Sequence, residues 1–197
     1  ELSEEQTLDS LRALSSSGRK ANTIIESLLL LSSVRQQDVR TEPLAMDVVI
    51  AEALSRLTNQ ITSSSAHIQM QKPDAWPTAL GHAPWVEEVW VNYISNALKY
   101  GGQPPSIILS ARRGPDGFVR FCVHDHGPGL TAVQQARLFT QFERLGKRNV
   151  HGHGLGLSIV SRIVGKLGGR VGVESEVGQG CTFYFTLPGT GVESSQD

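Results

Sequence analysis

The sequence is short of cysteine, of net charge and of long hydrophobic runs, and each shortage excludes a class of protein. Two cysteines among 197 residues make no disulfide framework, which fits a reducing cytoplasmic location. A formal net charge of −1 gives no long-range field toward nucleic acid or an anionic membrane. The longest aliphatic run covers residues 28–31, far below the ~20 residues of a membrane-spanning helix. We therefore expect a cytoplasmic globular protein that contacts neither nucleic acid nor membrane.

Proline is absent from residues 4–37, and Gly18 is the one glycine there. Apolar and small residues recur every three or four positions, which predicts one long helix with a broad apolar face: Leu8, Leu11, Ser15, Gly18, Asn22, Ile25, Leu29 and Ser32. Such a face needs a partner helix, from a second chain or from preceding sequence. Residue 1 is Glu rather than Met and no secretory signal is visible, so we expect a piece of a longer protein.

After Pro43 the pattern changes to shorter elements. The expected helices cover about 48–63, with Asp47 as the cap, about 83–99, a short stretch near 131–140 and a stretch that ends near 167. The expected strands form two hairpins, one of 106–113 with 118–126 and a closing one that ends in "TFYFTLP". This order predicts an α+β fold, an α/β sandwich in which a mixed β-sheet is covered on one face by three helices. The expected domains are 1–42, 43–190 and a polar tail at 191–197.

A polar stripe runs along the helix expected over 83–99. Glu88, Asn92, Asn96 and Lys99 are spaced at i, i+4, i+8 and i+11, on a different face from the apolar residues. The stripe is either a solvated face or a ligand site. As a site, Asn96 offers a carbonyl oxygen of the kind that Mg²⁺ prefers, and Lys99 neutralises phosphate charge.

Two glycine-containing stretches also suggest a nucleotide. In "VHDHGPGL" a strand runs into Asp125, whose carboxylate can accept a hydrogen bond from an exocyclic amine such as adenine N6, while Gly127 and Gly129 let a flat base approach. An ordinary turn has the same composition. In "HGHGLGLSIV" alternate glycines lead into a helix, a pattern that favours phosphate binding. Its G-x-G-x-G spacing matches neither the dinucleotide fingerprint nor the Walker loop.

Between residues 84 and 188 the chain carries, in order, N-x-x-x-N-A-x-K-Y, D-x-G-x-G, F-x-x-F-x-R, G-x-G-L-G-L and G-x-G-x-T-F. This order resembles the ATP-binding domain of sensor histidine kinases, a superfamily shared with gyrase, heat-shock chaperone and mismatch-repair ATPases. The long helix resembles the second helix of the kinase dimerisation domain. The resemblance implies ATP and Mg²⁺ as ligands, a response regulator receiver domain as partner, and a homodimer through the N-terminal helix of the intact protein.

The resemblance also implies roles for single residues. Asn96 matches the Mg²⁺-binding asparagine and Asn92 its upstream companion. Lys99 and Tyr100 match residues that contact the phosphates and the adenine. The other matches are the adenine-reading box (Asp125, Gly127 and Gly129), the box at the start of the ATP lid (Phe139, Phe142 and Arg144), the triphosphate box (Gly152, Gly154, Leu155 and Gly156) and the last box (Gly178, Gly180 and Thr182). Lys147 and Arg148 lie in the lid and either face the γ-phosphate or stay solvated.

One part of the family pattern is missing. A histidine kinase needs a phosphoacceptor histidine on the first dimerisation helix, and the first histidine here is His67, beyond the long helix. We therefore expect this fragment to bind ATP and to donate the γ-phosphoryl group to a histidine that the fragment lacks, for relay to a response regulator aspartate. The alternatives are an ATP-binding regulatory or dimerisation module without transfer activity, and a related serine kinase of the same superfamily.

Histidines and a cysteine cluster around the adenine-reading box. Cys122, His124 and His126 alternate along one expected strand and so point the same way, and His151 and His153 make a second H-x-H pair. A soft-metal site is one reading of this pattern, and exposed imidazoles along the nucleotide cleft are the other. Cys122 and Cys181 either form a redox disulfide or stay as two buried, inert thiols.

Overall fold

The computed structural model describes residues 39–71, 75–138 and 156–190, together with single residues and short groups between 3 and 34. Its contacts divide the chain into two units, Glu1–Gln37 and Asp38–Asp197. In the first unit the described residues from 10 to 34 are helical, and four of their large apolar side chains are exposed: Leu11, Leu14, Ile25 and Leu29. The continuity of the long helix and its partner helix stay predictions.

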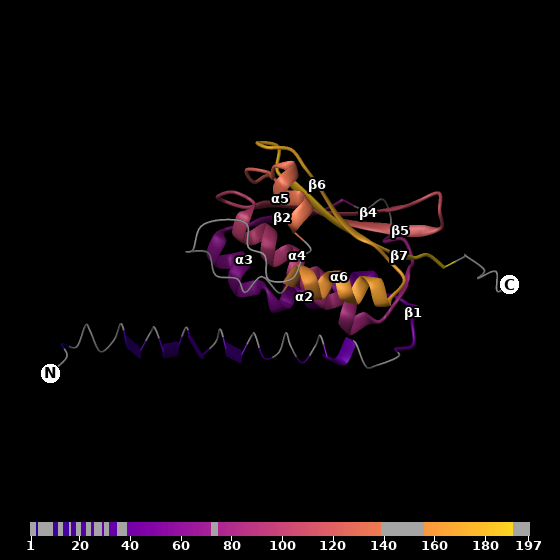
Figure 1. Ribbon diagram of the computed structural model, residues 1–197, viewed down its shortest axis with the longest axis horizontal. Coiled ribbons are helices and arrows are strands. Elements are labelled where there is room, and N and C mark those ends of the chain that lie inside the picture. The colour runs from indigo at the N-terminus through magenta and orange to yellow at the C-terminus, as the bar shows by residue number, and fades with distance from the viewer. Residues whose placement is uncertain are drawn as a thin grey trace. The chain divides into compact units, whose positions relative to one another are not determined.

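The second unit is built on a mixed five-stranded sheet with the order β2-β4-β5-β7-β6 (Figure 1). Its strands are β2 (His67–Gln71), β4 (Ser106–Arg113), β5 (Phe118–Asp125), β6 (Val171–Ser175) and β7 (Cys181–Pro188). β2 pairs parallel with β4, and the other neighbours pair antiparallel. The two predicted hairpins, β4 with β5 and β6 with β7, are therefore confirmed. A separate two-stranded sheet joins β1 (Glu42–Pro43) to β3 (Leu80–Gly81).

Helices cover one face of this sheet. Figure 1 shows them together on one side of strands β4, β5 and β7, with α4 contacting α2, α6 and β5. The helices are α2 (Met46–Arg56), α3 (Thr58–Ser64), α4 (Ala83–Tyr100) and α6 (Gly156–Lys166), while the short α5 (Ala132–Arg137) contacts β6. The predicted α+β sandwich is confirmed, with four helices where three were expected.

Burial alternates strictly along β5 and β7, as period-2 side-chain geometry requires when one face is covered. The odd-numbered residues of both strands face the helices, and the even-numbered ones face away. The centre of the core is aromatic: Trp90 of α4 packs edge-on against Phe185 and Phe121, with ring centres 5.4 and 6.1 Å apart. All three side chains are fully buried. This core holds α4 against the middle of the sheet.

The predicted helix over 48–63 is wrong in two details. It breaks at Leu57, whose N–H bonds only to Leu54 O, three residues back, and the Thr58 hydroxyl donates to Ser55 O at 2.8 Å. Such side-chain bonds to the preceding turn compete with a continuous helix. Asp47 does not cap α2 either: the N-cap is Ala45, and Asp47 lies in the first turn, where a carboxylate favours the helix dipole. None of the described helices is long and apolar enough to cross a membrane.

Candidate nucleotide-binding site

The polar stripe of α4 lies where the sequence predicted it. Asn92 and Asn96 are half-buried, and the Asn92 side chain donates from Nδ2 to Glu88 O at 2.8 Å. Lys99 and Tyr100 are exposed at the C-terminal end of the helix. Desolvation by the surrounding protein lowers the pKa of Lys99, and within the described chain no carboxylate pairs with it. The stripe thus offers two amide groups and a cation without a salt-bridge partner.

The N-terminus of α6 meets this stripe. A Cβ added at Gly156, the first residue of α6, would collide with Asn92 Oδ1. Helices α4 and α6 pack against one another. A glycine at the first position of α6 leaves room for the Asn92 side chain. A helix N-terminus carries partial positive charge and unpaired N–H groups, and it is a common site for phosphate. Asn92 therefore lies beside a surface suited to an anion.

Asp125 ends β5 and is buried, with 3% of its surface exposed. Burial raises the pKa of its carboxyl group, and the backbone amides of Gly127 and Cys181 and the nearby His124 and His126 oppose the rise. Its Oδ1 accepts a hydrogen bond from Gly127 N at 2.9 Å. A carboxylate held this way has a fixed orientation, which is what a base-reading acceptor requires.

The C-terminal end of α4 contacts the turn that follows Asp125. A Cβ at Gly127 would collide with Tyr100 O and would lie 3.1 Å from Gly101 Cα, and one at Gly101 would lie 2.9 Å from Asp125 Cβ. These approaches bring Lys99 and Tyr100 to the same end of the sheet as Asp125. Residues that are about 25 apart in the sequence therefore lie at one end of the sheet.

A set of hydrogen bonds fixes the loop after Gly127. Leu130 N donates to Ser175 Oγ at 2.8 Å, Ser175 Oγ donates to Gly180 O at 2.6 Å, and Gly178 N donates to Pro128 O at 2.8 Å. Gly180 has a φ of +83° and would collide with Asp125 O if it carried a Cβ, so glycine is needed there for two reasons. The turn that contains Gly178 and Gly180 thus holds the loop of Gly127, Pro128 and Leu130 in place.

Gly129 shows the same dependence on close approach. Its φ is +69°, and a Cβ would collide with Glu176 O in the turn between β6 and β7. The loop continues into α5 through a capping box, in which Thr131 and Gln134 bond each other's backbone. Gln135 then donates to Leu130 O and Ser175 O at 3.0 and 2.8 Å. This end of the site is rigidly attached to the sheet.

Thr182 lies on the face of the sheet that points away from the helices, whereas Asp125 points toward them. Thr182 is paired with His124 in the β5–β7 ladder, and its Oγ1 lies 2.9 Å from His124 Nδ1, on the face away from the helices. The residue opposite Asp125 is Cys181, which is buried and shares the covered face. Burial raises the pKa of the Cys181 thiol to about 11. The sequence analysis weighed Cys181 as a buried thiol, and its alternation with Phe183 and Phe185 places it on the covered face.

The remaining predicted residues lie outside the described part of the chain. They are Phe139, Phe142, Arg144, Lys147, Arg148, Gly152, Gly154 and Leu155. The ATP-lid and triphosphate assignments at these positions stay predictions.

The structure bears on the predicted cysteine pair and on the predicted metal cluster. Cys122 and Cys181 are free and lie on opposite faces of the sheet. Across the described residues, no three His, Cys, Asp or Glu side chains gather as a metal ion would require. The three-ligand soft-metal reading is therefore not met in residues 39–71, 75–138 and 156–190.

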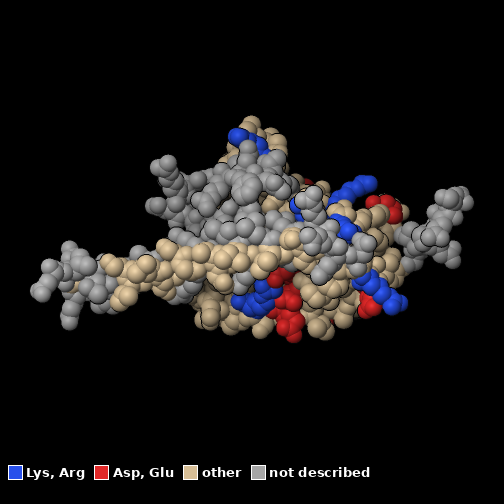
Figure 2. Space-filling model, turned by 60° about the horizontal axis from the view of Figure 1, so that its bottom comes forward, with Lys and Arg blue, Asp and Glu red and all other residues tan. Residues whose placement is uncertain are grey.

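Glu88 continues the stripe toward the start of α4. Arg56 of α2 donates from Nη1 to the Glu88 carboxylate at 2.6 Å and to the Glu87 carboxylate at 2.8 Å. Acidic and basic side chains likewise lie in small adjacent groups on the face shown in Figure 2. Neither sign of charge dominates the described part of that face.

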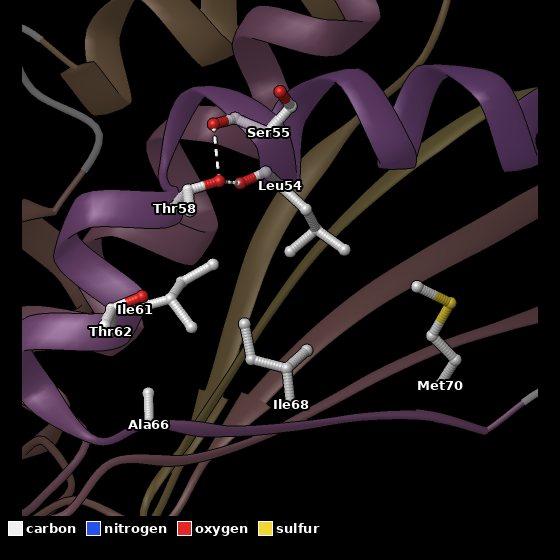
Figure 3. A pocket seen from close by; sticks show the side chains of 8 residues that line it. All are labelled: Leu54, Ser55, Thr58, Ile61, Thr62, Ala66, Ile68 and Met70. Carbon is white, nitrogen blue, oxygen red and sulfur yellow. Dashed lines mark hydrogen bonds between the residues drawn. The ribbon is translucent and has the colours of Figure 1, made fainter.

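A groove elsewhere in the unit contains none of the predicted site residues. It has a volume of about 410 Å³ and lies between helices α2 and α3 and the edge strand β2 (Figure 3). The side chains of Leu54, Ile61, Ile68 and Met70 point into it in Figure 3. Its other lining residues are Ser55, Thr58, Thr62 and Ala66, so no cationic side chain lines it, and the α4 and β5 residues remain the candidate site.

Known proteins are similar to this chain in sequence. Residues 81–191 match the family described as histidine kinase-, DNA gyrase B- and HSP90-like ATPase. The chain is 34% identical over 173 residues to cyanobacterial phytochrome A of Nostoc sp., a match covering 87% of this chain and 22% of that protein. It is 28% identical over 173 residues to the adaptive-response sensory kinase SasA of Synechococcus elongatus, covering 86% of this chain and 45% of that protein.

Solved structures show the same similarity. Full-length ShkA in complex with AMPPNP matches with a TM-score of 0.74 and 28% identity, over 96% of this chain and 40% of that one. The histidine kinase AdeS of Acinetobacter baumannii matches with a TM-score of 0.72 at 18% identity, over 96% of this chain and 87% of that one, and so shares the fold. The chain spans between about a fifth and a half of the length of the curated relatives named above.

Proposed function

We propose, from the premise that this chain belongs to the family of histidine kinase-, DNA gyrase B- and HSP90-like ATPases, that it binds ATP with Mg²⁺ and donates the γ-phosphoryl group to a histidine. The catalytic domain is of the kind found in histidine kinases. The receiving histidine would lie on a dimerisation helix that this sequence lacks, and the phosphoryl group would then pass to a response regulator aspartate.

One observation carries the proposal: Asn92 lies against the first residue of α6, while the same helix α4 ends beside Asp125. A nucleotide has a base at one end and phosphates at the other. Here a fixed carboxylate lies at one end of α4, and amide groups with a helix N-terminus lie along it. This arrangement matches the two chemically different ends of ATP.

Each residue then has a specific task. Asp125 accepts a hydrogen bond from the adenine amine, a charged interaction of about 1.5–3 kcal/mol. Lys99 and the N-terminus of α6 neutralise phosphate charge. The side-chain oxygens of Asn96 and Asn92 are hard donors, which fit Mg²⁺, and the ion would supply charge neutralisation between phosphates.

The chemistry needs position and charge more than covalent help from the protein. A ring nitrogen of the acceptor histidine attacks the γ-phosphorus, the bond from that phosphorus to the β,γ-bridging oxygen breaks, and ADP leaves. The chain's contribution is to hold the triphosphate in a fixed position at the N-terminus of α6. The lid residues between about 142 and 153 are proposed to close over the nucleotide.

Calorimetric titration of this chain with ATP, with and without Mg²⁺, tests the binding part. We expect ATP to bind, GTP to bind more weakly because it lacks the adenine amine, and Asn96→Ala to lose the Mg²⁺ dependence. Absence of any nucleotide binding would contradict the proposal. Binding without transfer of labelled phosphate to a supplied phosphoacceptor domain of a sensory kinase relative would instead favour the regulatory module.

A further inference from the structure

The sheet has a second face that the proposed function does not use. The even-numbered residues of β5 and β7 point away from the helices, and the open face that they form ends in two histidines. His124 is half-buried on β5, and His126 follows the strand and is exposed. Both lie beside Asp125 in the sequence, yet Asp125 itself points to the covered face.

The two imidazoles lie together. Their ring centres are 4.7 Å apart, and the rings meet edge to face at 79°. Each ring has its Nδ1 atom engaged: His124 Nδ1 lies 2.9 Å from Thr182 Oγ1, and His126 Nδ1 lies 3.2 Å from Ser106 O. No described residue bonds to either Nε2 atom.

The partner of His126 defines which of its ring nitrogens has the lone pair. A carbonyl oxygen can only accept, so His126 donates from Nδ1–H to Ser106 O and keeps the lone pair on Nε2. The Thr182 hydroxyl can accept from His124 in the same way. Hydrogen bonding of the second ring nitrogen is the usual arrangement around histidines that bind a metal.

We propose that His124 and His126 bind one divalent cation of borderline softness, namely Zn²⁺, Ni²⁺ or Cu²⁺, through their Nε2 atoms. Imidazole ligands select these ions over Mg²⁺, which prefers oxygen. Because no third histidine, cysteine or carboxylate gathers at this point within the described chain, water completes the coordination. The site is separate from the nucleotide site and does not depend on the proposed kinase activity.

The test is a calorimetric titration of the full chain with Zn²⁺ alone, in a buffer that does not chelate metals. His151 and His153 form another H-x-H pair outside the described residues, so every protein carries H151Q and H153Q. We expect binding of one equivalent, weakened about tenfold or more by either His124→Gln or His126→Gln. The matched control is His67→Gln, an exposed histidine on β2 of the same sheet, and it should leave the affinity unchanged.

Two further readouts keep the result interpretable. Circular dichroism and thermal melting without metal show whether each variant is folded. In the protein that retains His124 and His126, added Zn²⁺ should move the imidazole nitrogen resonances of those two residues and leave those of His67 and His82 in place. No binding in this background, or equal weakening by His67→Gln, overturns the proposal.

Discussion

The two faces of strand β5 differ in burial and in polarity. On the covered face Phe121, Val123 and Asp125 are fully or almost fully buried, and Asp125 ends the strand beside α4. On the open face Arg120, Cys122 and His124 are half-buried and polar. One strand therefore contributes both to the core and nucleotide site and to a separate polar surface, because adjacent residues point to opposite sides.

The largest contrast should appear in stability. Phe121→Ala removes a ring that packs against Trp90 and Phe185, and we expect a loss of about 3–5 kcal/mol of unfolding free energy. Cys122→Ala, the next residue on the open face, should cost far less. Urea denaturation of both variants measures the difference, and equal losses would show that the two faces do not differ as the burial indicates.

In nucleotide affinity the contrast should be smaller but still clear. Asp125→Asn removes the carboxylate acceptor, and we expect ATP binding to weaken about ten- to a hundredfold. His124→Gln changes the neighbouring residue on the open face and should leave ATP affinity nearly unchanged. Calorimetric titration of both variants with ATP measures the two affinities. An Asp125→Asn protein that binds ATP like the parent would remove Asp125 from the site.

The pH dependence of stability should also separate the faces. Because burial raises the pKa of Asp125, the folded state holds its proton more tightly than the unfolded chain does. Its contribution is therefore fully present below about pH 3.9, the ordinary Asp pKa, and is lost as pH rises through the raised pKa. The unfolding free energy of the parent should fall relative to that of Asp125→Asn over this window. Parallel curves from urea unfolding at several pH values would count against the raised pKa.

The smallest effect is expected on the open face itself. The Arg120 guanidinium stacks on Tyr184, 3.6 Å from the ring centre, and pairs with the largely exposed Glu174. Since exposed ion pairs contribute little, Glu174→Gln should cost about 0.2–1 kcal/mol at most, and less in high salt. Urea unfolding at low and at high ionic strength measures this cost. A larger loss that persists in high salt would mean that this face is packed like the core.

Much of the site could be predicted because its residues are local signals. The stripe of Asn92, Asn96 and Lys99 follows from helical spacing alone, and Asp125 with Gly127 follows from a strand that ends in a turn. The close approaches of Gly101 to Asp125 and of Gly127 to Tyr100 bring these separate signals to one end of the sheet. The role assigned to Thr182 stays a prediction, because a motif gives a position in the chain and not the face of the sheet, and Thr182 lies on the face away from the helices. A shift of one residue along a strand reverses the face, and here it puts Cys181 beside Asp125.

Composition and periodicity determined the elements themselves. Alternating apolar residues made β5 and β7, the helical repeat made α4, and glycines marked the turns, since each depends only on neighbours in the chain. Three features depended on the tertiary structure: the break at Leu57, the parallel pairing of β2 with β4, and the register that opposes Asp125 to Cys181. These are set by contacts between residues far apart in sequence, where packing of the whole core selects one arrangement among several that local propensity allows.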